Sequence, residues 1–317
     1  MLHRPMDSVI PLCLFTLVLL LTSIGSAAAQ NSTPTVGDGG TPSAAGIVES
    51  MVSVDGRSLH LACAGTGTPT VVFEQGGPTS AAGTSLITAL GPDLAAALGT
   101  RFCAYDRAGT GQSDADPVGV RTFTEAATDL QAVLASPELA CPCVVIGESL
   151  GGSIALVALS ADASNFAGLV LLDTNYPGSF DEFLALAPAG SPEAALADDP
   201  NLNGANEEQL DLAVGFSQVT APAQPPGIPV VVVTHGAGFP PPCNWEPPCS
   251  ADYPVAEFEA AWQAGQSALA AALGGRLIVA EGIGHAIATE NPELVVGLVA
   301  EVVAAVRDPS SWATPAP

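Results

Sequence analysis

Residues 143–156, CVVIGESLGGSIAL, decide the fold of this chain. They combine a short apolar strand, a Gly-x-Ser-x-Gly turn and a helix of small and apolar residues. Such a sharp turn holds its central residue, Ser149, in a strained backbone conformation and lifts the hydroxyl above the sheet edge. Gly147 and Gly151 are needed because a Cβ there would collide as strand and helix close up. The N–H of Leu150 lies at the helix N-terminus, where it can stabilise an oxyanion, so we interpret Ser149 as a nucleophile.

The segments around this turn alternate between apolar strands and amphipathic helices, which indicates an α/β fold. Residues 166–172 are almost unbroken in their apolarity, as is typical of a central parallel strand. An Asp-Gly pair at 55–56 predicts a β-hairpin. Besides the strand that enters the turn, the predicted strands are 48–54, 59–64, 70–74, 101–105, 166–172, 228–233 and 276–280. The predicted helices are 124–134, 258–273 and one that opens at 291–293.

The composition favours a folded domain with few anionic partners. The chain has 317 residues, of which 48% are hydrophobic and 12% charged, so a sizeable core is available. Its formal charge is −25, because 32 acidic residues face seven basic ones. This charge disfavours nucleic acid and anionic membrane surfaces as partners.

The N-terminus has the pattern of an export signal. Residues 1–29 contain Arg4, an apolar run at 9–21 and an Ala-Ala-Ala cleavage site at 27–29. The alternative is an uncleaved membrane anchor, since the run is nearly long enough to cross a bilayer. After cleavage we expect a flexible spacer at 30–45, a folded domain at 46–307, a polar tail at 308–317 and no membrane partner.

A second motif carries a resemblance to a known family. Residues 106–114 read DRAGTGQSD, and the Gly-x-Ser-x-Gly turn follows some forty residues later. This pattern resembles the α/β-hydrolase superfamily, close to its secreted esterase- and aminopeptidase-like members. The resemblance implies a mostly parallel eight-stranded sheet flanked by helices, with a short cap inserted over the site. It also implies that 106–114 is a structural loop, so we assign no chemistry to Asp106 or Arg107.

The resemblance assigns further positions around the nucleophile. It implies that Gly76-Gly77-Pro78 forms the oxyanion loop, in which Gly77 gives the second N–H beside that of Leu150. Gln75 stands where the family usually has His. The cap would be 178–227, which has no strand pattern and many acidic residues. We expect a short acidic lid, with a solvated surface insertion as the alternative.

The general base and the acid are expected after the later strands. His285 follows the last predicted strand and precedes the final helix, which is the position of the family's general base. Asp173 is the first polar residue after 166–172, where side chains face the ligand crevice, so it is our candidate for the acid. Glu246 and Asp252 remain alternatives. His235 follows strand 228–233, where many family members have the acid, and we interpret it as a rim or core residue.

The cysteines agree with export. Seven are present, and removal of Cys13 with the signal leaves six. The strand order implied by the resemblance makes Cys63 and Cys103 neighbours. Cys243 and Cys249 would close the Pro-rich loop between them. The pairing of Cys141 and Cys143 stays open, because a bridge between residues two apart would be strained. Cys-x-x-Cys spacing is absent from the sequence, so no zinc or other metal is expected.

Together these features predict a secreted serine hydrolase that cleaves a small ester through a Ser149-His285-Asp173 triad, with an amide as the less favoured alternative substrate. No cofactor is expected, and the partner is a small-molecule substrate. Two alternatives stay open: a non-catalytic binding protein on the same fold, and a membrane-anchored surface hydrolase.

Overall fold

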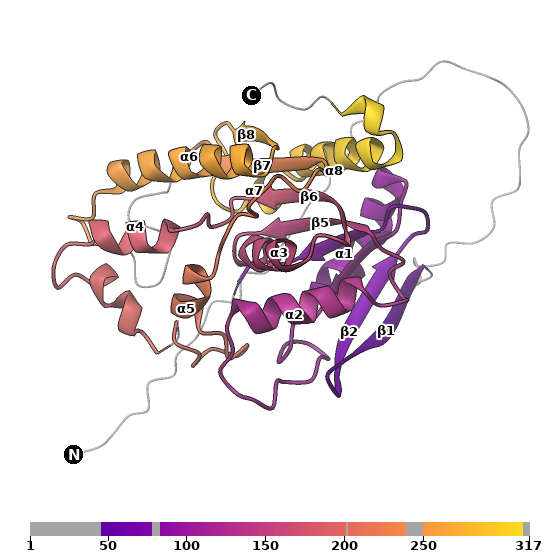
Figure 1. Cartoon of the computed structure of the whole chain (residues 1–317), viewed down its shortest axis with the longest axis horizontal. Coiled ribbons are helices and arrows are strands. Elements are labelled where there is room, and N and C mark those ends of the chain that lie inside the picture. The colour runs from indigo at the N-terminus through magenta and orange to yellow at the C-terminus, as the bar shows by residue number, and fades with distance from the viewer. Residues whose placement is uncertain (1–45, 78–82, 201, 239–249, 313–317) are drawn as a thin grey trace, which may run out of the picture. The chain divides into compact units, whose positions relative to one another are not determined.

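The computed structural model describes residues 46–77, 83–200, 202–238 and 250–312, and in these residues eight strands form one mixed sheet. The strand order is β1-β2-β4-β3-β5-β6-β7-β8 (Figure 1). β1 to β2 and β2 to β4 are antiparallel, and every later neighbour is parallel. The strands are β1 (Ile47–Val54), β2 (Arg57–Ala64), β3 (Val71–Glu74), β4 (Phe102–Tyr105), β5 (Cys143–Glu148), β6 (Phe166–Leu172), β7 (Val230–His235) and β8 (Arg276–Ala280).

Several sequence predictions fall outside the described residues. These are the signal and spacer at 1–45, Pro78 of the oxyanion loop, the 243–249 loop with Glu246, and the last residues of the tail. The described residues belong to one unit, Ala44–Pro317. Among them, no helix has the length and apolarity needed to cross a membrane.

Helices cover both faces of the sheet, as predicted for an α/β fold. α2, α3 and α6 pack on one face, and α1 and α8 pack on the other (Figure 1). The helices are α1 (Gly83–Leu98), α2 (Phe123–Leu134), α3 (Leu150–Ala161), α4 (Ser179–Leu186), α5 (Leu212–Ser217), α6 (Val255–Ala272), α7 (Ile287–Glu290) and α8 (Pro292–Arg307), with 3-10 turns η1 (Glu193–Asp198) and η2 (Pro309–Ser311).

Alternate residues of the central strands contribute to two separate cores. In β7, Val230 and Val232 join the α2, α3 and α6 side, whereas Val231 and Val233 join the α1 and α8 side. Burial on both faces is the reason that these strands are continuously apolar in sequence. The carboxyl ends of the parallel strands β5, β6 and β7 consequently lie at one edge of the sheet.

The hairpin prediction is confirmed, because β1 and β2 pair with Val54 opposite Arg57 across the Asp-Gly turn. The helix α1 was not predicted. Its sequence contains Gly91 and Pro92, which disfavour a helix, and packing of Ile87 and Leu98 on the sheet stabilises it instead.

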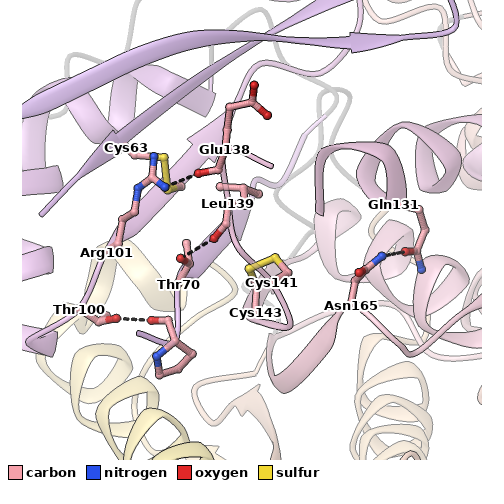
Figure 2. The surroundings of a disulfide bond; sticks show 12 residues. Cys63, Thr70, Thr100, Arg101, Gln131, Glu138, Leu139, Cys141, Cys143 and Asn165 are labelled. Carbon is pink, nitrogen blue, oxygen red and sulfur yellow. Dashed lines mark hydrogen bonds between the residues drawn. A yellow bond between two sulfur atoms is a disulfide. The ribbon is translucent and has the colours of Figure 1, made fainter. Parts of the chain in front are cut away.

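Within the described residues, two disulfides lie near the edge of the sheet where the parallel strands begin. Cys63 and Cys103 are opposite each other on β2 and β4, and their predicted bridge is confirmed. Cys141 pairs with Cys143 at the start of β5, which answers the question that the sequence left open. Figure 2 shows this second bond beside Leu139, whose backbone oxygen accepts a 2.8 Å hydrogen bond from Thr70.

The cap segment between β6 and β7 contains α4, η1 and α5. Phe216 of α5 packs edge-on against Phe123 of α2, with ring centroids 5.3 Å apart. Two of the acidic residues in this segment are buried, because Glu193 and Glu208 are each 2% exposed. The surface-insertion alternative therefore does not describe these two acids.

Candidate active site

The turn between β5 and α3 has the strained geometry that the motif predicts. Ser149 has φ 49° and ψ −118°, a positive-φ conformation that residues with a side chain rarely adopt. A Cβ on Gly147 would overlap the backbone of Gly152, and a Cβ on Gly151 would overlap the carbonyl oxygen of Glu74. Glycine is therefore the only residue that these two positions accept. The turn leaves the Ser149 side chain partly exposed above the sheet.

His285 lies between Ser149 and Asp173. It sits on the loop between β8 and α7, with its side chain 42% exposed. Its Nε2 is 3.1 Å from Ser149 Oγ, and its Nδ1 is 2.6 Å from Asp173 Oδ2. A base within this distance of a hydroxyl can take its proton, and a carboxylate on the other ring nitrogen fixes the tautomer.

Asp173 is the carboxylate that the structure brings to His285. It follows β6 directly, is fully buried, and has a positive φ of 45°. Asp252, one of the two alternatives, is exposed on the segment before α6, and Glu246 is outside the described residues. The strand-end position of Asp173, between β5 and β7, is what allows it to reach the histidine loop.

Asp173 is held by several donors besides His285. Trp262 Nε1 donates to its Oδ1 at 3.1 Å, as does the backbone N–H of His235, and Thr234 Oγ1 donates at 3.2 Å. Burial alone would raise the pKa of Asp173, but hydrogen bonds from His235 and His285 outweigh it and hold that pKa well below its usual range. Asp173 is therefore ionised at neutral pH.

His235 is a core residue, as predicted, and its contacts are ones that sequence reasoning missed. Its ring is buried between Asp173 and Glu259 of α6. A signal was present: Glu259, Trp262 and two glutamines, Gln263 and Gln266, are spaced along one face of α6. All of these side chains bind groups at the ends of β6 and β7.

The predicted oxyanion donors flank the nucleophile. Leu150 is the first residue of α3, directly after Ser149. On the other side, a Cβ on Gly76 would be 3.5 Å from Ser149 Cβ, so the loop after β3 passes next to the serine. Gly77, the next residue, has φ 127°, which strongly favours glycine.

Arg107 supports this loop, a role that the resemblance did not assign. Its guanidinium is 1% exposed and donates to the carbonyl oxygens of Gln75 at 2.5 Å and Gly76 at 3.1 Å. It also binds Glu74 Oε1 at 2.9 Å and forms a two-pronged contact with Glu208 of the cap at 2.6 and 2.8 Å. A fully buried arginine with five donor groups can satisfy them all only with such a set of partners.

Glu148, next to the nucleophile, also lies in this region. Burial raises the pKa of its carboxyl, while attraction from His285 acts in the opposite direction. In the part of the chain that the structure describes, no group of His, Cys, Asp or Glu side chains has the arrangement of a metal site.

Comparisons with known proteins agree with the fold. Residues 85–187, about a third of the chain, match the family model described as serine aminopeptidase, S33. No curated protein matches the sequence. Similar solved structures include three that are superposable along most of their length.

The first is α/β hydrolase domain-containing protein 10 from mouse, with a TM-score of 0.55 and 17% identity, covering 80% of this chain and 96% of that one. The second is an esterase from Exiguobacterium antarcticum, with a TM-score of 0.52 and 19% identity, covering 81% and 98%. The third is an epoxide hydrolase, CorEH, with a TM-score of 0.51 and 17% identity, covering 82% and 100%. This chain therefore has the α/β-hydrolase fold, and its residues 85–187 resemble the S33 serine aminopeptidases.

Proposed function

We propose that the protein is a serine hydrolase that cleaves a small ester through a covalent acyl-enzyme. The observation that carries this proposal is the continuous contact from Ser149 Oγ through the His285 ring to the Asp173 carboxylate. An epoxide hydrolase and an esterase share the fold, so the fold alone does not choose the chemistry. The proposal therefore rests on the side chains of the site.

In the proposed reaction, His285 Nε2 takes the proton of Ser149 as Oγ attacks the ester carbonyl carbon. Asp173 stabilises the imidazolium that forms, and the N–H groups of Gly77 and Leu150 stabilise the oxyanion. His285 then gives the proton to the leaving alcohol. A water molecule, deprotonated by the same histidine, attacks the acyl-enzyme and releases the acid. These steps need no cofactor.

A labelling experiment tests the nucleophile. A fluorophosphonate probe is expected to label the wild-type protein covalently, because it reacts with an activated serine. Ser149→Ala should abolish the label, measured by intact-protein mass spectrometry. Ser160→Ala, on the last turns of the same helix, is the matched control and should keep it. Equal labelling of wild type and Ser149→Ala would contradict the assignment.

A second candidate is hydrolysis of an amide, and the match of residues 85–187 to serine aminopeptidases favours it. Both candidates use the same acyl-enzyme and differ in the leaving group. Assays of the purified protein on a panel of p-nitrophenyl esters and amino-acid amides separate them. Turnover of esters alone supports the first candidate, and comparable turnover of amides supports the second.

We also propose that the protein is exported. The signal pattern at 1–29 motivates this, and the two disulfides support it, because such bonds persist in oxidising compartments. We expect the mature chain to begin near Gln30, as read by mass spectrometry of the protein from its native host. Peptide mapping without reduction should recover Cys63 joined to Cys103. An intact Met1 on a membrane-bound form would favour the anchored alternative.

A further inference from the structure

A second imidazole, that of His235, contacts the same carboxylate oxygen of Asp173 as His285 does. The His235 side chain is fully buried at the end of β7, and its Nδ1 is 2.7 Å from Asp173 Oδ2 and 2.9 Å from Oδ1. Its other nitrogen, Nε2, is 2.9 and 3.2 Å from the two carboxylate oxygens of Glu259. Contacts therefore run without a gap from Glu259 through His235, Asp173 and His285 to Ser149.

The environment of His235 selects its charged form. A neutral imidazole has one N–H, but here both ring nitrogens face carboxylate oxygens, and only the imidazolium can donate to both. Burial acts to lower the pKa of His235, but hydrogen bonds and attraction from Asp173 and Glu259 outweigh it and raise that pKa.

Among the described residues, Asp173 after β6 and Glu259 of α6 are the charged groups within hydrogen-bond distance of the ring. The register partner of His235 on β8 is Ala280, which carries no charge. The Trp262 ring of α6 stacks on the His235 ring, with centroids 6.0 Å apart. Glu148 acts through space on Asp173 and His285.

Asp173 needs such a partner. Burying a carboxylate with no exposed surface is costly unless donors and an opposite charge compensate it, and the His235 ring supplies both. Two imidazoles contact the same oxygen, Oδ2, from different elements, so His235 also fixes where that oxygen lies.

We propose that His235, anchored by Glu259, is a positioning residue that orients Asp173 for His285 and offsets the negative charge of its carboxylate. The inference rests on the proposed serine hydrolase. Glu259 has a specific part in it: its negative charge balances the positive charge of His235, so the group behind His285 keeps a net charge of one carboxylate.

Two substitutions are expected to move the pH profile in opposite directions. His235→Asn keeps an N–H donor near Asp173 but removes the cation, so two carboxylates remain and protonated His285 becomes more stable. The acid limb of the reaction, which reports protonation of the base, then moves to higher pH. Glu259→Gln removes a negative charge but leaves His235 on Asp173, so the limb moves to lower pH.

The measurement is the second-order rate constant of fluorophosphonate labelling of the full chain, from about pH 5 to about pH 9, the range in which histidine titrates. At the optimum, His235→Asn should label about ten- to hundredfold more slowly than wild type, as expected for the loss of one charge-assisted hydrogen bond. Thermal unfolding of each variant is recorded beside it.

The chain offers a matched control. His60 is another buried imidazole on a buried carboxylate, with Nδ1 3.0 Å from Asp106 Oδ2, and it lies on β2, outside the contacts that reach Ser149. His60→Asn should lower stability to a similar degree and leave the acid limb where the wild type has it.

One outcome would overturn this inference alone: the wild type is labelled, but the acid limbs of the pH profiles of His235→Asn and Glu259→Gln coincide with that of His60→Asn. An unlabelled wild type would overturn the proposed function and this inference with it. If His235→Asn does not fold, Glu259→Gln decides, because the Glu259 side chain is 24% exposed and its replacement is isosteric.

Discussion

Replacing Ser149 with alanine is expected to lower kcat on the best ester substrate by about six orders of magnitude. Adding His285→Ala to the same chain should cost almost nothing more. The reason is that the hydroxyl and the imidazole, 3.1 Å apart, carry out one proton transfer together, so neither helps without the other. The residual rate would come from the oxyanion donors and substrate binding.

The measurement is kcat for the two single variants and the double variant on one substrate, with circular dichroism to show that each is folded. Losses that multiply in the double variant would mean that the two side chains act independently. That result would contradict the proposed chemistry while leaving the fold unaffected.

Asp173→Asn is expected to lower kcat by about four orders of magnitude with the fold retained. The carboxylate accepts hydrogen bonds on both oxygens, from His285 and His235 on Oδ2 and from Trp262 on Oδ1. An amide has a single acceptor oxygen, so its NH₂ group must face a donor. If the NH₂ group faces His285, the histidine must adopt the wrong tautomer. If it faces the other way, the remaining donors around position 173 lose their acceptor.

Asp252→Asn is the control, because this exposed aspartate was an alternative for the acid, and it should keep wild-type turnover. Steady-state kinetics of both variants on one ester, with thermal unfolding curves, provide the comparison. Near-normal turnover of Asp173→Asn together with loss in Asp252→Asn or Glu246→Gln would assign the acid to the loop before α6.

The sheet and the strand ends could be predicted because their signals are local. β6 was predicted with the bounds that the structure has, and Asp173 follows as the first polar residue after it. Since parallel strands end at one edge of a sheet, its nearness to His285 could be inferred without knowing any side-chain contact. The tight turn at Ser149 was equally local, because its glycines lie within the motif.

Features that depend on tertiary packing were not predictable in the same way. The contact of His235 with Glu259 joins residues of β7 and α6, and it depends on the rotation of α6 about its own axis. Periodicity shows which residues share a helix face but not which strand end that face contacts. The same holds for Arg107, whose partners Glu74 and Glu208 come from segments far apart in sequence.

The buried guanidinium of Arg107 ties the segment between β6 and β7 to the loop after β3, and this limits how that segment can change. Removing one partner of a buried ion pair costs about 3–5 kcal/mol, a large part of a domain's stability. A segment transplanted here from another protein of this fold would therefore need a carboxylate in the place of Glu208, or the loop that carries Gly77 would lose part of its support. Other residues of this segment can change without breaking that contact, whereas position 208 is tied to the loop that passes next to Ser149.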